Sequence, residues 1–192
     1  MKKFSTFLLI VFVLGWICAC STPPKEEMEK AHDAVTRAEN DADAVTYASN
    51  TLVRARDALT RMQNEADAKR YDSAKTYAAE AVNSAERAIS EGKAGAARAK
   101  QEAENLVNSL PGSLAETANA LNAAWNAEKV QLDFAALTVD LEQARRTYDD
   151  ARVSLQASNY RGAISQGQNV RSILSDINTR ITEAAQVLSR KQ

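Results

Sequence analysis

The residue types that could perform catalysis are scarce in this sequence, and the clearest arrangement is Glu29-Lys-Ala-His32. A carboxylate and an imidazole at this Glu-x-x-His spacing share one helix face, and di-iron bundles place such a motif on each of two helices. His32 is the only histidine in the chain, so a second motif cannot form, and the low histidine count also argues against Ser-His-Asp and Cys-His nucleophiles. We therefore interpret His32 as a solvated residue and predict that the protein is not an enzyme and holds no metal or cofactor.

The composition argues against two further classes of partner. The formal net charge is -1, so the sequence offers no basic surface that would attract nucleic acid. Gly92 and Gly95 lie in a helical stretch without a preceding strand, which is the wrong context for a phosphate-binding loop. We expect neither a nucleic acid nor a small-molecule ligand.

The first residues have the order of a secretory signal. Lys2 and Lys3 precede an apolar run from Phe7 to Leu14, as an n-region precedes an h-region. The run is shorter than the roughly 20 apolar residues of a membrane-spanning helix. The residues after it decide between a lipoprotein signal, an ordinary cleaved signal that leaves a free thiol, and an uncleaved membrane anchor.

The four residues from Ile17 to Cys20 resemble the lipobox of bacterial lipoproteins, with an aliphatic residue first, a small residue third and the acylated cysteine last. Cys18 stands where Ala, Ser or Thr is usual. The resemblance implies that residues 1–19 are a cleaved signal peptide, that Cys20 carries the lipid, and that residues 20–25 are a lipidated tether. Two or three acyl chains, palmitate among them, would hold the protein stably on a membrane.

The rest of the chain has the periodicity of long helices. From Glu26 to Ala66, small and apolar residues recur at every third or fourth position, which predicts a first helix of about 40 residues. A second helix carries an alanine stripe, and it needs a partner helix because small residues bury little area but permit close approach. The stripe consists of Tyr71, Ala74, Ala78, Ala81, Ala85, Ala88, Gly92, Ala96, Ala99 and Ala103.

Pro111-Gly112 is the clearest break after the signal segment and predicts that the second helix ends near Leu110. Ser113 and Glu116 have capping-box spacing, which predicts the start of a third helix. This segment therefore divides the helical part of the chain into two halves.

A turn at residues 158–159 precedes a fourth helix with unbroken apolar spacing. Short turns join antiparallel neighbours, so the sequence predicts an all-α fold of two long antiparallel helical hairpins, residues 26–110 and 113–190. The hairpins either pack as one elongated four-helix bundle or join end to end as a coiled-coil-like rod.

The two hairpins also resemble each other. A shift of about 89 residues, without gaps, places the Ala-Arg pair at 55–56 on that at 144–145, and Tyr71 on Tyr160. Such a constant register predicts a duplicated unit whose second copy has diverged.

The stretch from Tyr47 to Leu52 and the turn from Tyr71 to Ala74 resemble a family of alanine-rich helical domains in bacterial envelope lipoproteins. That family has Tyr-Ala-Pro, an Ala- and Leu-spaced helix, a Gly-x-Tyr-x-x-Ala turn and a second alanine-striped helix. Ser49 replaces the usual Pro, and Arg70 replaces the Gly or Asp of the turn. The resemblance covers residues 26–99, and the second hairpin follows only as a diverged copy. The family has no assigned activity, and some members adjoin peptidoglycan-binding domains, which implies a role in envelope architecture.

Four residues allow two interpretations each. Gly92 and Gly95 could mark a kink or a close contact between helices, and we favour contact because Gly92 lies on the alanine stripe. Trp125 and Phe134 are the only Trp and Phe left once residues 1–19 are removed. They could form an exposed patch that binds a partner or lipid, but we favour an interpretation in which they fill the core.

These observations favour a lipid-anchored structural or interaction scaffold of the bacterial cell envelope, facing the periplasm. Its partners would be the membrane, through Cys20, and other envelope proteins or a second copy of the chain. A surface-exposed ligand-binding or adhesin lipoprotein and a carrier of lipid or another apolar ligand are the alternatives.

Overall fold

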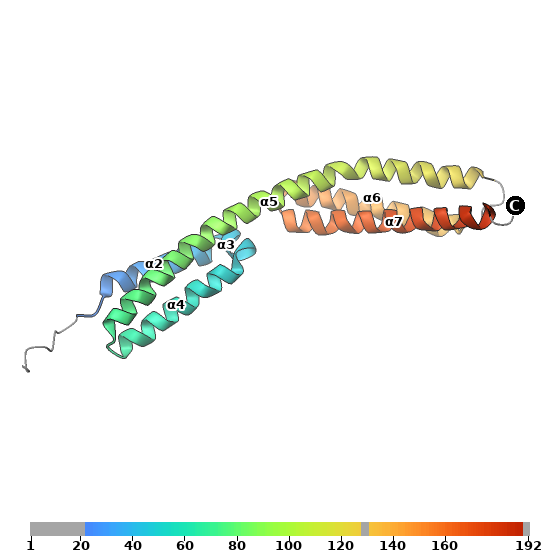
Figure 1. The fold of residues 1–192 in the computed structure, drawn as a ribbon. Coiled ribbons are helices and arrows are strands. Elements are labelled where there is room, and N and C mark those ends of the chain that lie inside the picture. The colour runs from blue at the N-terminus through green and yellow to red at the C-terminus, as the bar shows by residue number, and fades with distance from the viewer. Residues whose placement is uncertain (1–21, 128–130, 190–192) are drawn as a thin grey trace, which may run out of the picture. The chain divides into compact units, whose positions relative to one another are not determined.

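A computed structural model describes residues 22–127 and 131–189. Within these ranges the protein is all-helical, without strands, which confirms the predicted fold class (Figure 1). The chain divides between Lys93 and Ala94 into two compact units, here called unit 1 and unit 2. Its helices are α2 (Lys25–Asn40), α3 (Ala42–Tyr47), α4 (Ser49–Asp67), α5 (Tyr71–Asn126), α6 (Phe134–Gln156) and α7 (Tyr160–Ser189).

The predicted first helix of about 40 residues is wrong, because three helices, α2, α3 and α4, occupy that segment. Asp41 separates α2 from α3 with an extended backbone, and its carboxylate accepts a 2.8 Å hydrogen bond from the Ala44 amide. Such a hydrogen bond from the backbone to a side chain competes with continuation of α2 and favours the start of a new helix. Ala48 leaves the helical region between α3 and α4.

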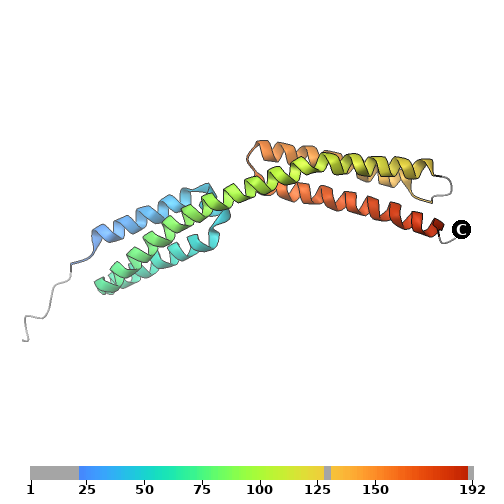
Figure 2. The same ribbon diagram turned by 45° about the horizontal axis from the view of Figure 1, so that its top comes forward.

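Unit 1 has a core made mostly of alanine. Helices α2 and α4 lie along the first part of α5 in both ribbon views (Figures 1 and 2). Val35, Leu52 and Met62 are its larger buried side chains. Four alanines of the predicted stripe supply the α5 face of this core: Ala78, Ala81, Ala85 and Ala88. The other alanines of the same cluster come from the chain before α5: Ala31, Ala34, Ala38, Ala44, Ala48, Ala55 and Ala58.

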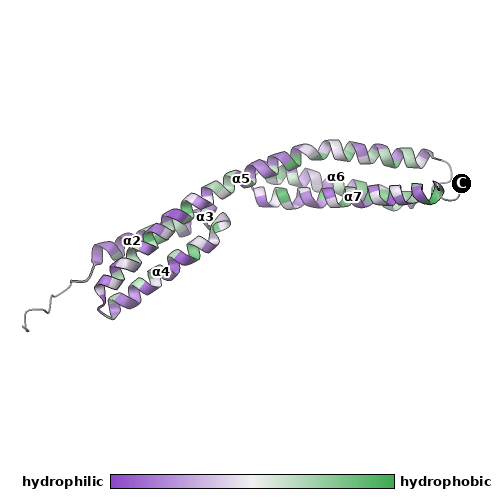
Figure 3. Cartoon of the chain, in the orientation of Figure 1, coloured by the Kyte–Doolittle hydropathy of each residue, from purple (hydrophilic) through white to green (hydrophobic). Residues whose placement is uncertain are grey.

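Unit 2 is built from the second part of α5 together with α6 and α7. Its core contains larger side chains than that of unit 1, with Leu137, Val170 and Ile177 all buried. Figure 3 shows hydrophobic and hydrophilic residues alternating along the helices, as expected where one face of each helix is buried.

Helix α5 belongs to both units and continues through Pro111-Gly112, so the predicted helix end at Leu110 and the predicted cap at Ser113 are wrong. Proline inside a helix costs about 3 kcal/mol. Leu110 and Leu114 flank this proline in sequence and are both buried in the unit 2 core. Each buried leucine contributes about 1.5–3 kcal/mol, which offsets the cost of the proline.

The turn before α5 and the turn before α7 have the same geometry. Lys69 and Ser158 adopt φ of 58° and 59°, a left-handed conformation that is uncommon outside glycine. The Arg70 amide donates to the Glu65 carbonyl at 2.8 Å, and the Asn159 amide donates to the Ser154 carbonyl at 2.9 Å. Every residue in the second turn lies 89 positions after its counterpart in the first, the shift found in the sequence.

Candidate functional site

The Glu29-x-x-His32 motif lies on the outer surface of α2, and both residues are exposed. Across residues 22–127 and 131–189, no group of three or more His, Cys, Asp or Glu side chains could hold a metal ion. The interpretation of His32 as a surface residue agrees with its exposure.

The predicted lipidation site, Cys20, lies outside the described residues. The described chain begins just after it and enters α2 through Pro23-Pro24, where the Lys25 amide donates to the Pro23 carbonyl at 2.9 Å. In the part of the chain that the structure covers, no helix has the length and apolarity to cross a membrane.

Gly92 brings α5 into direct contact with the backbone of α3. A Cβ atom at Gly92 would lie 2.5 Å from the Ala44 nitrogen and 2.6 Å from the Asp43 carbonyl carbon. Real Cβ atoms do not approach backbone this closely, so only glycine fits without movement. The interpretation of Gly92 as a site of close contact between helices is confirmed.

A polar cluster beside this contact joins α4 to α5, and sequence reasoning missed it. The Thr51 hydroxyl is buried and donates to the Glu91 Oε2 at 2.5 Å, while Arg87 Nε donates to Glu91 Oε1 at 3.1 Å. The hydrogen bond from Thr51, with help from the charges of Arg87 and Arg54, lowers the pKa of the Glu91 carboxyl. The available signal was a threonine on the buried face of α4, between Ala48 and Leu52.

The lowered pKa of Glu91 predicts how the stability of unit 1 depends on pH. A carboxyl whose pKa is depressed on folding stabilises the folded state above its ordinary pKa, and this stabilisation is lost as pH falls through the folded value. We expect Thr51→Val to raise the Glu91 pKa toward its ordinary value and to flatten the pH dependence of unfolding in the acid range. An NMR titration of the Glu91 carboxyl measures the shift.

The matched control for this prediction is Thr60→Val, because the Thr60 hydroxyl donates to the Arg56 carbonyl on its own helix at 3.0 Å. It should leave the Glu91 titration unchanged. An unchanged Glu91 pKa in Thr51→Val would contradict the assigned role of the hydroxyl.

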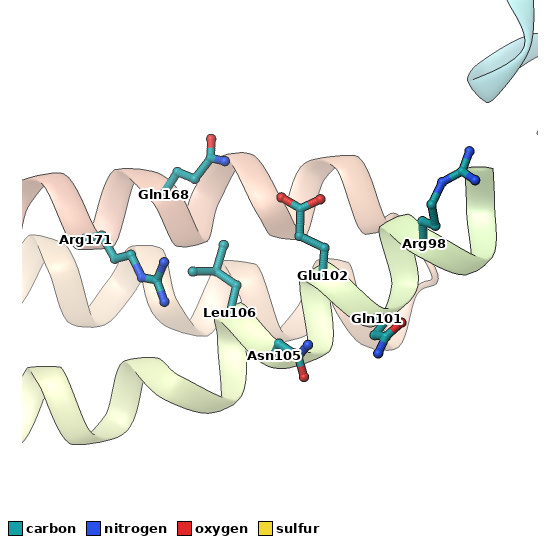
Figure 4. Close-up of a pocket in the computed structure, with 7 residues that line it drawn as sticks. All are labelled: Arg98, Gln101, Glu102, Asn105, Leu106, Gln168 and Arg171. Atoms are coloured by element: carbon teal, nitrogen blue, oxygen red, sulfur yellow. The ribbon is translucent and has the colours of Figure 1, made fainter. Parts of the chain in front are cut away.

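A surface groove of about 460 Å³ lies between α5 and α7 in unit 2 (Figure 4). Leu106 lies in its middle, pressed against Gly167, where a Cβ atom would lie 2.7 Å from the leucine Cδ2. Arg171 donates to the Ser109 hydroxyl at 3.0 Å. The groove offers hydrogen-bonding groups and charges of both signs through Arg98, Gln101, Glu102, Asn105, Gln168 and Arg171.

Unit 1 has two adjoining grooves, of about 550 and 250 Å³, between α2 and α5. Both are lined by Lys30 and Val82, and small residues such as Ala34 and Ala79 lie among the charged side chains of their rims. The 89-residue shift places Ala79 and Val82 on Gln168 and Arg171 of the unit 2 groove. These grooves were not predicted from the sequence, because their lining residues come from α2 and α5, which are far apart in the sequence and meet only in the folded protein.

The interpretation of Trp125 as a core residue is wrong, since 67% of its surface is exposed. Its ring contacts Phe134 edge-to-face, with centroids 5.0 Å apart and planes at 76°. Phe134 is partly buried against the unit 2 core. Trp125 lies one residue before the end of α5, and its side chain is exposed although the preceding Ala124 is buried.

Comparison with known proteins identifies one domain. Residues 26–106 match the family described as Domain of unknown function (DUF4398), so a DUF4398 domain is present over unit 1 and the adjoining part of α5. This agrees with the expectation of a helical domain without assigned activity in this part of the chain. No curated protein and no solved structure matches the chain.

Proposed function

We propose that this protein is a lipid-anchored lipoprotein that acts as a structural or interaction scaffold in the bacterial cell envelope. The observation that carries the proposal is the lipobox-like segment from Ile17 to Cys20, which follows a charged n-region and an apolar run. Cys20 would be acylated and would become the first residue after cleavage. The prolines and polar residues before Lys25 would then join the lipid to α2.

The structure of the described residues supports a scaffold through its surfaces. Helices with buried seams of alanine and leucine leave long, charged faces and shallow grooves outside. Such faces suit contacts with other envelope proteins better than they suit the enclosure of a small molecule. The DUF4398 domain in unit 1 has no assigned activity.

We also infer that the two units are diverged copies of one helical module. The support is the constant 89-residue register that relates their turns and the backbone hydrogen bonds of those turns. The repeated hairpins would then be α4 with the first part of α5, and α6 with α7, which are shorter than the predicted hairpins of residues 26–110 and 113–190. The alanine core of unit 1 and the leucine- and isoleucine-containing core of unit 2 would reflect the divergence.

Acylation of Cys20 is tested by substitution of each cysteine in turn. In a bacterial host fed radiolabelled palmitate, we expect the full chain to incorporate label and to partition into detergent. Cys20→Ser should abolish the incorporation of label, because its side chain lacks the thiol to which the lipid is attached.

Cys18→Ser is the matched control, since Ser is a usual residue at that lipobox position. It should label at least as well as the unaltered chain. Full labelling of Cys20→Ser, or loss of label in Cys18→Ser alone, would refute the assignment of the anchor to Cys20.

Protease digestion of the labelled protein separates the scaffold from the surface-exposed alternative. Digestion only after the cells are permeabilised would place the helices in the periplasm, as the scaffold proposal requires. Digestion on intact cells would favour the ligand-binding or adhesin alternative, and lipid retained after detergent removal would favour a carrier.

A further inference from the structure

Unit 2 ends in an apolar corner formed by Trp125 and Phe134. Trp125 is the most exposed of the large hydrophobic residues in the described chain, and its indole rests edge-on against Phe134. We propose that this corner is a bilayer-contact site that inserts Trp125 into the interfacial region of a zwitterionic lipid membrane. This contact is separate from the lipid anchor.

The chemistry of the corner fits the membrane interface. The stretch from Thr117 to Asn126 at the end of α5 contains no charged residue, so insertion would not require charges on that stretch to lose their hydration. Asp133, directly before Phe134, is exposed and caps α6. The indole N–H of Trp125 has no hydrogen-bond partner among the residues that the structure describes. An apolar ring with a free donor is the side chain that favours the interface, where lipid carbonyl and phosphate oxygens can accept.

The neighbouring end of α7 extends the apolar surface. The end of α7 lies at the same end of unit 2 as the end of α5 and the start of α6 in both ribbon views (Figures 1 and 2). Val187 is 52% exposed there, and Ile181 and Leu188 are only partly buried. The apolar side chains of α7 are thus only partly covered at this end of unit 2.

The size of the corner argues against a second copy as its occupant. Trp125, Phe134 and Val187 together expose apolar surface on the order of 300 Å², whereas a stable protein interface buries about 800 Å² on each partner. A bilayer sets no such minimum, because it is a continuous surface whose interface accepts a single amphipathic side chain. The lipid proposed on Cys20 would keep the chain at the membrane. The proposal uses the proposed anchor only as the source of proximity.

The test measures by fluorescence whether the side chain of Trp125 lies in the bilayer. The full chain with Trp16→Phe contains Trp125 as its single tryptophan. It is reconstituted into vesicles of plain phosphatidylcholine or of phosphatidylcholine brominated on its acyl chains near the headgroup. We expect the emission of Trp125 to shift to the blue on plain vesicles and to lose most of its intensity on brominated ones.

The control places the tryptophan elsewhere on unit 2. Val153 is 64% exposed and lies at the opposite end of α6 from Phe134. The variant Trp16→Phe, Trp125→Phe, Val153→Trp should therefore show no bromine quenching. Equal Trp125 emission on the two kinds of vesicle, or equal quenching at both positions, would overturn the proposal.

Two further readouts keep this test separate from the proposed function. Protection of Trp125 from aqueous iodide without vesicles would point to a protein contact and would overturn the bilayer proposal. Mass spectrometry of the same sample reports whether Cys20 is acylated. Quenching of Trp125 in a chain without acylation would support the bilayer contact of the corner and would refute the lipid anchor on Cys20.

Discussion

Gly92→Ala is expected to lower the free energy of unfolding of unit 1 by about 2 kcal/mol, although alanine is the better helix former by about 1 kcal/mol. The added Cβ would lie 2.5 Å from the Ala44 nitrogen, so α3 or α5 must move. The alanine core of unit 1 depends on this close approach, because its small side chains cannot fill a widened gap. Chemical denaturation, with hydrogen exchange read at amides of α3 and α4, measures the loss.

The same substitution at Gly112 is the matched control, since it lies on the same helix. A Cβ atom at Gly112 would have no neighbour within 4 Å. Gly112→Ala should therefore stabilise the protein by about 0.5–1 kcal/mol, as expected for glycine in an exposed helix interior. If the two variants change stability in the same direction, the contact at Gly92 is not the cause.

Ile177→Ala is expected to be the most damaging single truncation in unit 2, with a loss of about 3–4 kcal/mol. Ile177 is fully buried on α7 and belongs to the same cluster as Leu110 and Leu137. Its removal would leave a cavity in the core that holds α5, α6 and α7 together. Thermal unfolding should shift downward by more than about 10 °C, at about 4–8 °C per kcal/mol.

Val153→Ala provides the comparison, because the side chain is largely exposed on α6. Its stability should stay within about 0.5 kcal/mol of the unaltered chain. Hydrogen exchange should place the Ile177→Ala defect in unit 2, with amides of α4 unaffected. A defect of equal size in α4 would contradict the division of the chain after Lys93.

The fold could be predicted from the sequence where periodicity and packing agree. The 3,4 spacing of alanine and leucine predicted the helical class, the buried stripe and the turns before Tyr71 and Tyr160. It could not predict that α5 continues through Pro111. A local break signal competes there with the burial of Leu110 and Leu114, and the size of that burial depends on α6 and α7.

The interruptions at Asp41 and Ala48 were missed for a related reason. Small residues continue through both positions at helical spacing, so periodicity alone predicts a single helix. Asp41 has the side chain of an N-cap residue and could have signalled the start of α3. Ala48 has no side chain that could cap a helix, so it carries no such signal.

The candidate surfaces were less predictable than the fold. The close contact at Gly92 could be inferred because a glycine on a buried stripe leaves room for the backbone of a neighbouring helix. The environment of Trp125 could not, since the sequence does not state where α6 begins and how much of α5 it covers. The bond between Thr51 and Glu91 joins residues 40 positions apart, and no local pattern relates them.

Because α5 is one helix of 56 residues, the two units share more than a covalent link. The equilibrium constant for nucleating an isolated helix is about 10⁻³, which corresponds to a cost of about 4 kcal/mol. Extension of an existing helix costs little for each added residue. Once the core of unit 1 has fixed the first part of α5, the first helix of unit 2 can grow from its end. In a chain synthesised from its N-terminus, unit 1 would thus act as the nucleus on which unit 2 begins to fold.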